Sequence, residues 1–192
     1  ASAYRDLALA LVRQGKPEEA RRIVGDATSL GLADERLHAM RRRVDRIIDG
    51  PTFGKRFTVE SEHYVITSDI DEAVCRSAGK VLEGALAYYC RMLGNVRNKF
   101  AKGQRFQVYL FSGEQGYKRY LEGLELRIPI HTAGVYSPEL QQLLIWNLPN
   151  RTDMLRTIRH EGFHQYFDLL AADTPVWLNE GLAEYFEVSR FN

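Results

Sequence analysis

The sequence predicts an α+β protein, with helices at both ends of the chain and a small mixed sheet between them. Three observations support this class. Residues 1–50 place apolar side chains at the three- and four-residue spacing of amphipathic helices. Residues 57–146 alternate short β-branched and aromatic runs with helical stretches. Residues 152–188 return to helical periodicity.

Residues 1–50 are predicted to form a helical segment of their own. Gly15-Lys16-Pro17 makes the turn between the first two helices, Gly31 ends the second, and a third helix covers 33–49. The first pair of helices resembles a tetratricopeptide repeat, although Leu32 stands where a closing proline is usual. A plain helical hairpin is the alternative. Either arrangement offers a surface for a protein partner and carries no chemistry.

A second domain is predicted over 51–192, after the boundary at Asp49-Gly50-Pro51. It starts with two short strands and a long helix capped by Asp69 and reaching Gly94. A strand, a short helix and a two-stranded hairpin follow. The predicted strands cover 57–60, 63–67, 105–111, 132–136 and 140–146, and the short helix covers 116–121.

Two helices are predicted at the end of the chain. Thr152 or Asp153 caps the first, which reaches about Ala171. Asp173-Thr174-Pro175 interrupts the helical pattern, and the last helix covers 177–188. Within it, four apolar residues have the spacing of a core stripe: Trp177, Leu178, Leu182 and Phe186.

Bulk properties exclude several classes of function. The net charge of +1 gives no general attraction to nucleic acid. No apolar run reaches the roughly 18 residues that cross a membrane. Cys75 and Cys90 fall in one predicted helix, about 22 Å apart at 1.5 Å per residue, which is beyond the reach of a disulfide bond.

A candidate zinc site lies in the predicted helix that ends near Ala171. The run His160-Glu161-Gly162-Phe163-His164 spells H-E-x-x-H and brings two imidazoles to one helix face, four residues apart. Glu180 or Glu184 in the next helix can supply a third ligand, which leaves one coordination position for water. Glu161 then lies beside that water and can take its proton.

These motifs resemble those of the gluzincin metallopeptidases, and most closely those of bacterial proteins grouped as peptidase MA-like. The resemblance covers about 55–188 and depends on three motifs. They are A-G-x-Y at 133–136, H-E-x-x-H-Q at 160–165 and P-x-W-L-x-E-G-L-A-E-Y at 175–185. It implies a thermolysin-like catalytic domain, with a twisted sheet whose edge strand faces the metal cleft. It also implies a bacterial chain, and leaves the compartment open, export included.

The resemblance assigns roles to individual residues. His160, His164 and Glu180 would bind Zn²⁺, Glu161 would be the general base, and Glu184 would orient a ligating histidine. Asn179 matches a residue that commonly precedes the third ligand. The edge strand for substrate would consist of Ala133, Gly134, Val135 and Tyr136. Glu184 stays a rival third ligand, because only fifteen residues separate His164 from Glu180.

The sequence therefore predicts a zinc-dependent metallopeptidase acting on a peptide or protein substrate, in which Glu161 assists attack by a zinc-bound water. The alternative is a catalytically inactive zinc-binding module that captures peptides or partners.

The family's oxyanion-stabilising tyrosine or histidine lies further downstream, so the domain is expected to continue beyond Asn192. Gly162 could allow the edge strand or substrate to approach. Asp168 could accept a hydrogen bond from His164, although an ordinary surface charge is favoured.

Overall fold

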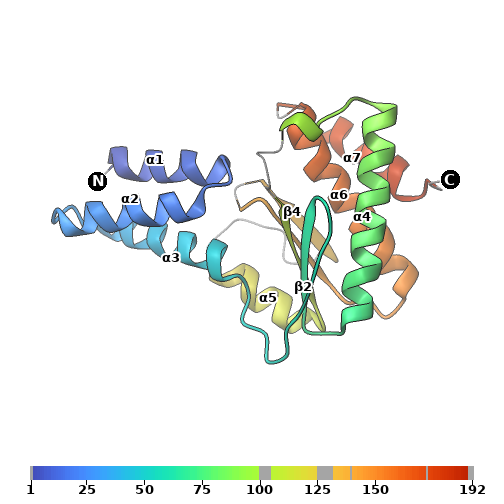
Figure 1. The fold of residues 1–192 in the computed structure, drawn as a ribbon, viewed down its shortest axis with the longest axis horizontal. Helices are drawn as coiled ribbons and strands as arrows, with labels where there is room; N and C mark the ends of the chain where they lie inside the picture. Colours follow the sequence, from blue (N-terminus) through green and yellow to red (C-terminus); the bar gives the residue numbers. More distant parts are fainter. Residues whose placement is uncertain (1, 100–104, 125–131, 139, 172, 190–192) are drawn as a thin grey trace. The chain divides into compact units, whose positions relative to one another are not determined.

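The computed structural model describes residues 2–99, 105–124, 132–138, 140–171 and 173–189. The chain divides into two compact units, Ala1–Thr52 and Phe53–Asn192. This division falls close to the boundary expected at Asp49-Gly50-Pro51. The second unit contains a five-stranded mixed sheet with helices, so the α+β class is confirmed (Figure 1).

The first unit is built from three helices, α1 (Ser2–Arg13), α2 (Pro17–Ser29) and α3 (Glu35–Asp49). Small residues line the contact between α1 and α2, where Ala8, Ala20 and Ala27 are fully buried. Leu37, Val44 and Ile47 of α3 complete the apolar interior. Asp34 caps α3, because its carboxylate accepts the Leu37 N–H at 2.7 Å.

The sheet has the order β1-β2-β3-β5-β4, which makes β4 an edge among the described strands. β2, β3 and β5 run parallel, while β1 pairs antiparallel with β2 and β4 antiparallel with β5. The bounds of the strands are β1 Phe57–Glu60, β2 Tyr64–Ser68, β3 Phe106–Phe111, β4 Gly134–Ser137 and β5 Gln142–Trp146. The hairpin of β4 and β5 was predicted, and its strands begin two residues later than expected.

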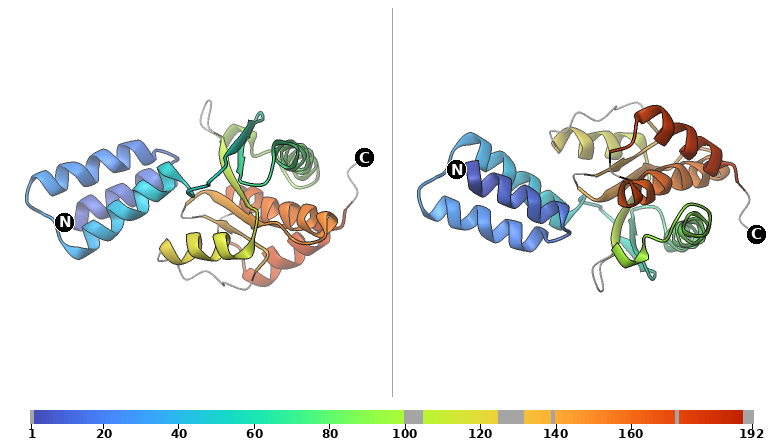
Figure 2. Two further views of the ribbon diagram at one scale, coloured as in Figure 1. Left: turned by 90° about the horizontal axis from the view of Figure 1, so that it is seen from below. Right: turned by 90° about the horizontal axis from the view of Figure 1, so that it is seen from above.

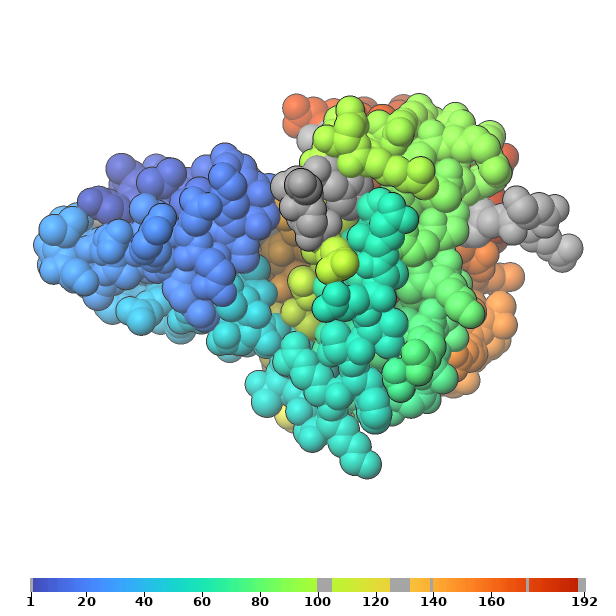
Figure 3. Space-filling model, viewed as in Figure 1, coloured from blue at the N-terminus to red at the C-terminus, as the bar shows by residue number. Residues whose placement is uncertain are grey.

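One face of the sheet is covered by α4 (Glu72–Met92) and α6 (Arg151–Leu170), which also pack on each other (Figure 2). Gly162 of α6 makes this packing close, since a Cβ there would lie 2.8 Å from Leu82 Cδ2 of α4. Gly162 therefore serves the contact between helices, and the predicted approach of the edge strand at this residue is wrong. The space-filling view shows α4 beside the β1–β2 hairpin (Figure 3).

The opposite face of the sheet is covered by α5 (Glu114–Gly123). β3 supplies both faces, because its side chains alternate. Val108 and Leu110 enter the core under α4 and α6. Tyr109 and Phe111 instead contact Tyr120 of α5 in tilted ring pairs, with centroids 6.2 and 5.7 Å apart. Burial on both sides is typical of a central parallel strand.

Two predicted helix caps are wrong by a few residues. Asp71 caps α4, accepting the Val74 N–H at 2.6 Å. The expected cap, Asp69, binds the backbone N–H and hydroxyl of Ser112 after β3 instead. Asn150 caps α6, because its side chain accepts the Thr152 N–H at 2.9 Å.

Cys75 and Cys90 are both free thiols in α4. Among the described helices, none combines the length and the apolar character that a membrane crossing requires.

Candidate metal centre

Helix α6 presents His160 and His164 on one face, one turn apart, with their ring centroids separated by 4.7 Å. The other side of α6 anchors the helix: Ile158 and Phe163 are fully buried in the core. The histidines are largely shielded from solvent, with 18% and 13% of their side-chain surface exposed. The core therefore fixes the helix, and the helix fixes both imidazoles.

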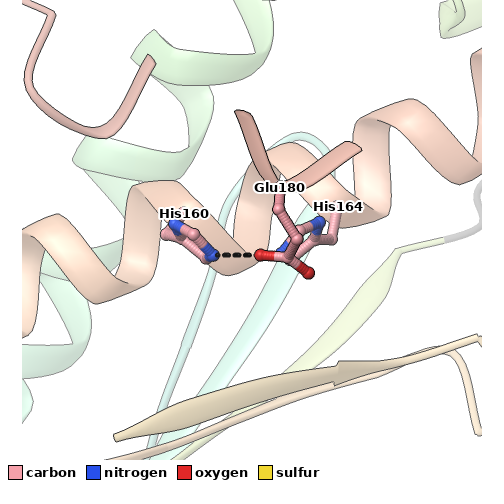
Figure 4. A group of neighbouring side chains, drawn as sticks. All are labelled: His160, His164 and Glu180. Atoms are coloured by element: carbon pink, nitrogen blue, oxygen red, sulfur yellow. Dashed lines mark ion pairs between the residues drawn. The ribbon is translucent and has the colours of Figure 1, made fainter. Parts of the chain in front are cut away.

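Helix α7 (Val176–Glu187) packs against α6 and brings Glu180 to the two histidines. One carboxylate oxygen, Glu180 Oε2, lies 3.4 Å from His160 Nε2 and 3.6 Å from His164 Nε2. Figure 4 shows this carboxylate reaching toward both imidazoles from the neighbouring helix. The predicted ligand atoms of His160, His164 and Glu180 all lie within 4.8 Å of one another.

These separations fit a zinc ion. Zinc binds imidazole nitrogen and carboxylate oxygen at about 2.0–2.2 Å in tetrahedral geometry, which separates neighbouring ligand atoms by about 3.3–3.6 Å. The two measured N–O distances fall in this range. Two imidazoles and one carboxylate are also a donor set that zinc prefers, and they leave a fourth position for water or substrate.

The remaining ring nitrogens point away from the centre and have partners on α7. His160 Nδ1 lies 3.1 Å from Glu187 Oε2, and His164 Nδ1 lies 2.9 Å from Asn179 Oδ1. Because an oxygen acceptor at Nδ1 favours the tautomer with its proton there, both Nε2 atoms keep a lone pair for a metal. Asn179, which precedes Glu180 in the chain, thus contacts His164 directly.

The structure differs from the sequence prediction at Glu184. This side chain is exposed and lies outside the ligand group, so it is neither the rival ligand nor the partner of a histidine among the described contacts. Glu187, two turns beyond Glu180, holds His160 instead. Residues 180 and 187 share a helix face, as a seven-residue separation is nearly two full turns. The sequence prediction does not include Glu187. The seven-residue spacing from Glu180 is the sequence feature that could have indicated its place beside the site.

Glu161 lies between the candidate metal ligands and β4. It is 8% exposed, and its Oε2 accepts the backbone N–H of Tyr136 at 2.7 Å. Burial raises the pKa of Glu161 above its usual value, against the opposing effects of His164, His160 and the Tyr136 N–H. Oε1 has no hydrogen-bond partner among the described residues, and the residue lines a cleft. A carboxylate held in this way can exchange a proton with a molecule in the cleft.

Gly134 allows β4 to approach α6 closely. A Cβ at this position would lie 2.8 Å from Thr157 Cγ2, 2.9 Å from Ile145 Cγ1 and 3.1 Å from Glu161 Cγ. No side chain fits in that space without displacing its neighbours. Gly134 therefore sets the distance at which the Tyr136 N–H reaches Glu161.

Among the described strands β4 is an edge of the sheet, and this edge contacts α6. Trp146 N–H donates to Ala133 C=O, which makes 133 and 146 a hydrogen-bonded pair of the antiparallel ladder. Backbone groups alternate in direction, so those of Gly134 and Tyr136 point away from β5. The Tyr136 N–H is taken by Glu161. Within the described parts of the chain, the outward groups with no partner are the Gly134 N–H and the carbonyls of Gly134 and Tyr136.

A cleft of about 400 Å³ connects these features. Its walls include residues of β4, α6 and the start of α7, together with Ala171 and Thr174, and the proposed ligands are among them. Fourteen described residues line it: Thr132, Gly134, Val135, Tyr136, Pro138, His160, Glu161, His164, Phe167, Asp168, Ala171, Thr174, Asn179 and Glu180. Three of the four predicted edge-strand residues are among them, and Ala133 is not.

Two further residues differ from expectation. Trp177, expected in the core stripe of α7, is 75% exposed, and Ala183 and Phe186 are the buried residues of that helix. Asp168 does not bond to His164. Its Oδ2 accepts the hydroxyl of Tyr136 at 3.0 Å, inside the cleft.

A second group of potential ligands, Glu62, His63 and Glu83, lies at the start of β2 and on α4. Here the Glu83 carboxylate already accepts the backbone N–H of His63 at 2.8 Å and contacts His63 Nδ1 at 2.7 Å. Burial alone would raise the pKa of Glu83, but hydrogen bonds from His63 and Ser61 lower it. These contacts join Glu83 of α4 to His63, the residue before β2. The proximity of the three side chains is thus explained by a structural link between α4 and β2.

Comparison with family models, with curated proteins and with solved structures found no match to this chain.

Proposed function

We propose that this chain is a zinc-dependent metallopeptidase of the gluzincin type, with a thermolysin-like catalytic domain. The observation that carries the proposal is the convergence of His160, His164 and Glu180 on one point, next to the buried Glu161 and a cleft of about 400 Å³. The H-E-x-x-H motif and the supporting contacts to Asn179 and Glu187 agree with this function.

Glu161 is the proton carrier in the proposed reaction. His160, His164 and Glu180 would hold the zinc ion, which would supply the Lewis acidity needed to ionise water near neutral pH and to polarise a carbonyl group. Glu161 takes the proton from the attacking water and returns it to the nitrogen of the leaving amine. Its hydrogen bond from Tyr136 keeps one oxygen fixed, and the other oxygen handles the proton.

The free edge of β4 is the proposed substrate platform. An extended peptide can add to this edge through the outward groups of Gly134 and the carbonyl of Tyr136. Cleft residues on α6 then lie alongside the peptide. A backbone held in this way presents a carbonyl to Glu161 and the ligand group.

The test compares the wild type with Glu161→Gln after loading with zinc. Glutamine retains an acceptor for the Tyr136 N–H but cannot take a proton, so we expect stoichiometric zinc and a kcat about 100- to 10,000-fold lower. Elemental analysis measures the zinc, and cleavage of a fluorogenic peptide library measures turnover. As a control, His160→Ala should lose both zinc and activity.

Undiminished turnover by Glu161→Gln would exclude the role of Glu161. Stoichiometric zinc in the wild type, with no peptide cleaved, would favour the inactive peptide-capture module. A wild-type chain without affinity for zinc would exclude both.

A further inference from the structure

Residues of α6 beyond the proposed metal ligands also line the cleft, and Asp168 is one of them. Asp168 lies one turn after His164 on the same helix face, about 6 Å further along the axis. Its Oδ2 accepts the Tyr136 hydroxyl at 3.0 Å. Burial and the Asp168 charge raise the pKa of Tyr136 above its usual value, so this hydroxyl stays a donor.

Nothing in the described part of the protein neutralises Asp168. No described lysine or arginine lines the cleft or pairs with this carboxylate. Lys99, a described cation near this end of α6, contacts the backbone carbonyls of Leu169 and Leu170. Asp168 also lies in the last turn of its helix, where the carbonyl ends carry negative partial charge and disfavour a second negative group.

Apolar residues share the cleft with Asp168. Phe167 and Ala171 line it, together with Tyr136 and Thr174. A lysine or arginine side chain matches such a site, because its aliphatic stem packs on apolar surface and its charge lies at the far end.

On this basis, and resting on the proposed function, we propose that Asp168 is a specificity-determining residue that binds the side chain of a lysine or arginine in the substrate. Asp168 Oδ1 accepts the cationic nitrogen, while Tyr136 holds Oδ2 in place.

The experiment uses peptides that differ at one position, carrying lysine, arginine, norleucine or glutamate, with that position moved along the sequence. We expect the wild type to prefer the cationic residues at one position. Asp168→Asn retains an acceptor for Tyr136, and should lower the lysine-to-norleucine ratio of kcat/KM about 10- to 100-fold. Asp153→Asn, an exposed residue of the same helix, should leave this ratio unchanged.

A binding arm separates this proposal from the proposed function. The affinity of the same peptides for Glu161→Gln, and for Glu161→Gln with Asp168→Asn, is measured by fluorescence anisotropy without any turnover. A selective loss of affinity for the lysine peptide in the double variant supports the Asp168 site, even if the wild type cleaves nothing. Equal losses for lysine and norleucine peptides would overturn it. A preference that disappears when the peptide amino terminus is acetylated would also overturn it.

Discussion

Each imidazole of the candidate centre is held by its own residue of α7. Asn179, next to Glu180, binds His164, and Glu187, seven residues after Glu180, binds His160. These hydrogen bonds fix the ring orientation and direct both Nε2 atoms at Glu180 Oε2. A carboxylate on the outer nitrogen of a ligating histidine also raises its basicity, and its removal typically costs 10- to 100-fold in metal affinity.

We expect different effects on zinc affinity from substitutions at Glu187 and at Glu184. Glu187→Gln removes the charge next to His160, so we expect zinc affinity to fall about 10-fold or more. Glu184→Gln alters an exposed side chain outside the group, and should leave the affinity unchanged. Competition with a chromophoric chelator measures both constants. The reverse order of effects would support the assignment made from the sequence.

The sequence predicts the ligands better than their partners. His160 and His164 share one helix, so their spacing alone brings them together. Glu180 and Asn179 follow from the motif of the next helix. Glu187, Tyr136 and Asp168 depend on how α7 and β4 pack on α6, and the distance between residues along the chain does not fix that packing.

At the scale of elements, the contact of β4 with α6 positions Glu161. Gly134 makes this contact possible, and the Tyr136 N–H completes it.

The order of strands and helices follows from their apolar periodicity, and all the predicted elements are present. Their ends are less well predicted, because a cap depends on which nearby acceptor is free. Asp69, engaged with Ser112, leaves Asp71 to begin α4.

Replacing Gly134 tests this contact. The Cβ of Gly134→Ala overlaps buried Ile145 and its neighbours, so we expect unfolding free energy to fall by about 1–3 kcal/mol. Activity of the remaining folded protein should fall as well, because Glu161 is displaced. Gly84→Ala is the control: this exposed residue of α4 has open space around its Cβ, and alanine should stabilise the helix by up to about 1 kcal/mol. Urea unfolding measures both changes, and equal effects would contradict the prediction.

For the whole molecule, every residue of the candidate centre belongs to the unit Phe53–Asn192. An ion that binds only the folded protein stabilises the unit that holds it, by about 4 kcal/mol at a thousandfold excess over Kd. No described residue of the unit Ala1–Thr52 belongs to the candidate ligand group. The stability of that unit should not respond to the metal.

Zinc removal should therefore affect one unit. We expect a chelator to lower the unfolding midpoint of the second unit by roughly 10 °C. Both tryptophans, Trp146 and Trp177, lie in this unit, so their fluorescence follows it selectively. The His160→Ala variant should show no response to zinc or chelator. A zinc response that persists in this variant would place the ion elsewhere.

The bond from Tyr136 to Glu161 has a consequence for association between molecules. An exposed edge strand can pair with the edge strand of another copy of the chain. Proteins therefore interrupt such edges, which limits aggregation. In β4 one of the outward donors is already used internally, and Gly134 offers the other. A hydrogen-bond ladder between two copies would lack the bond from the Tyr136 N–H, which Glu161 already accepts. A short peptide strand needs only the Gly134 N–H and the carbonyls of Gly134 and Tyr136. The edge of β4 can therefore bind a short peptide strand, but it is poorly suited to stable pairing with another copy of the chain.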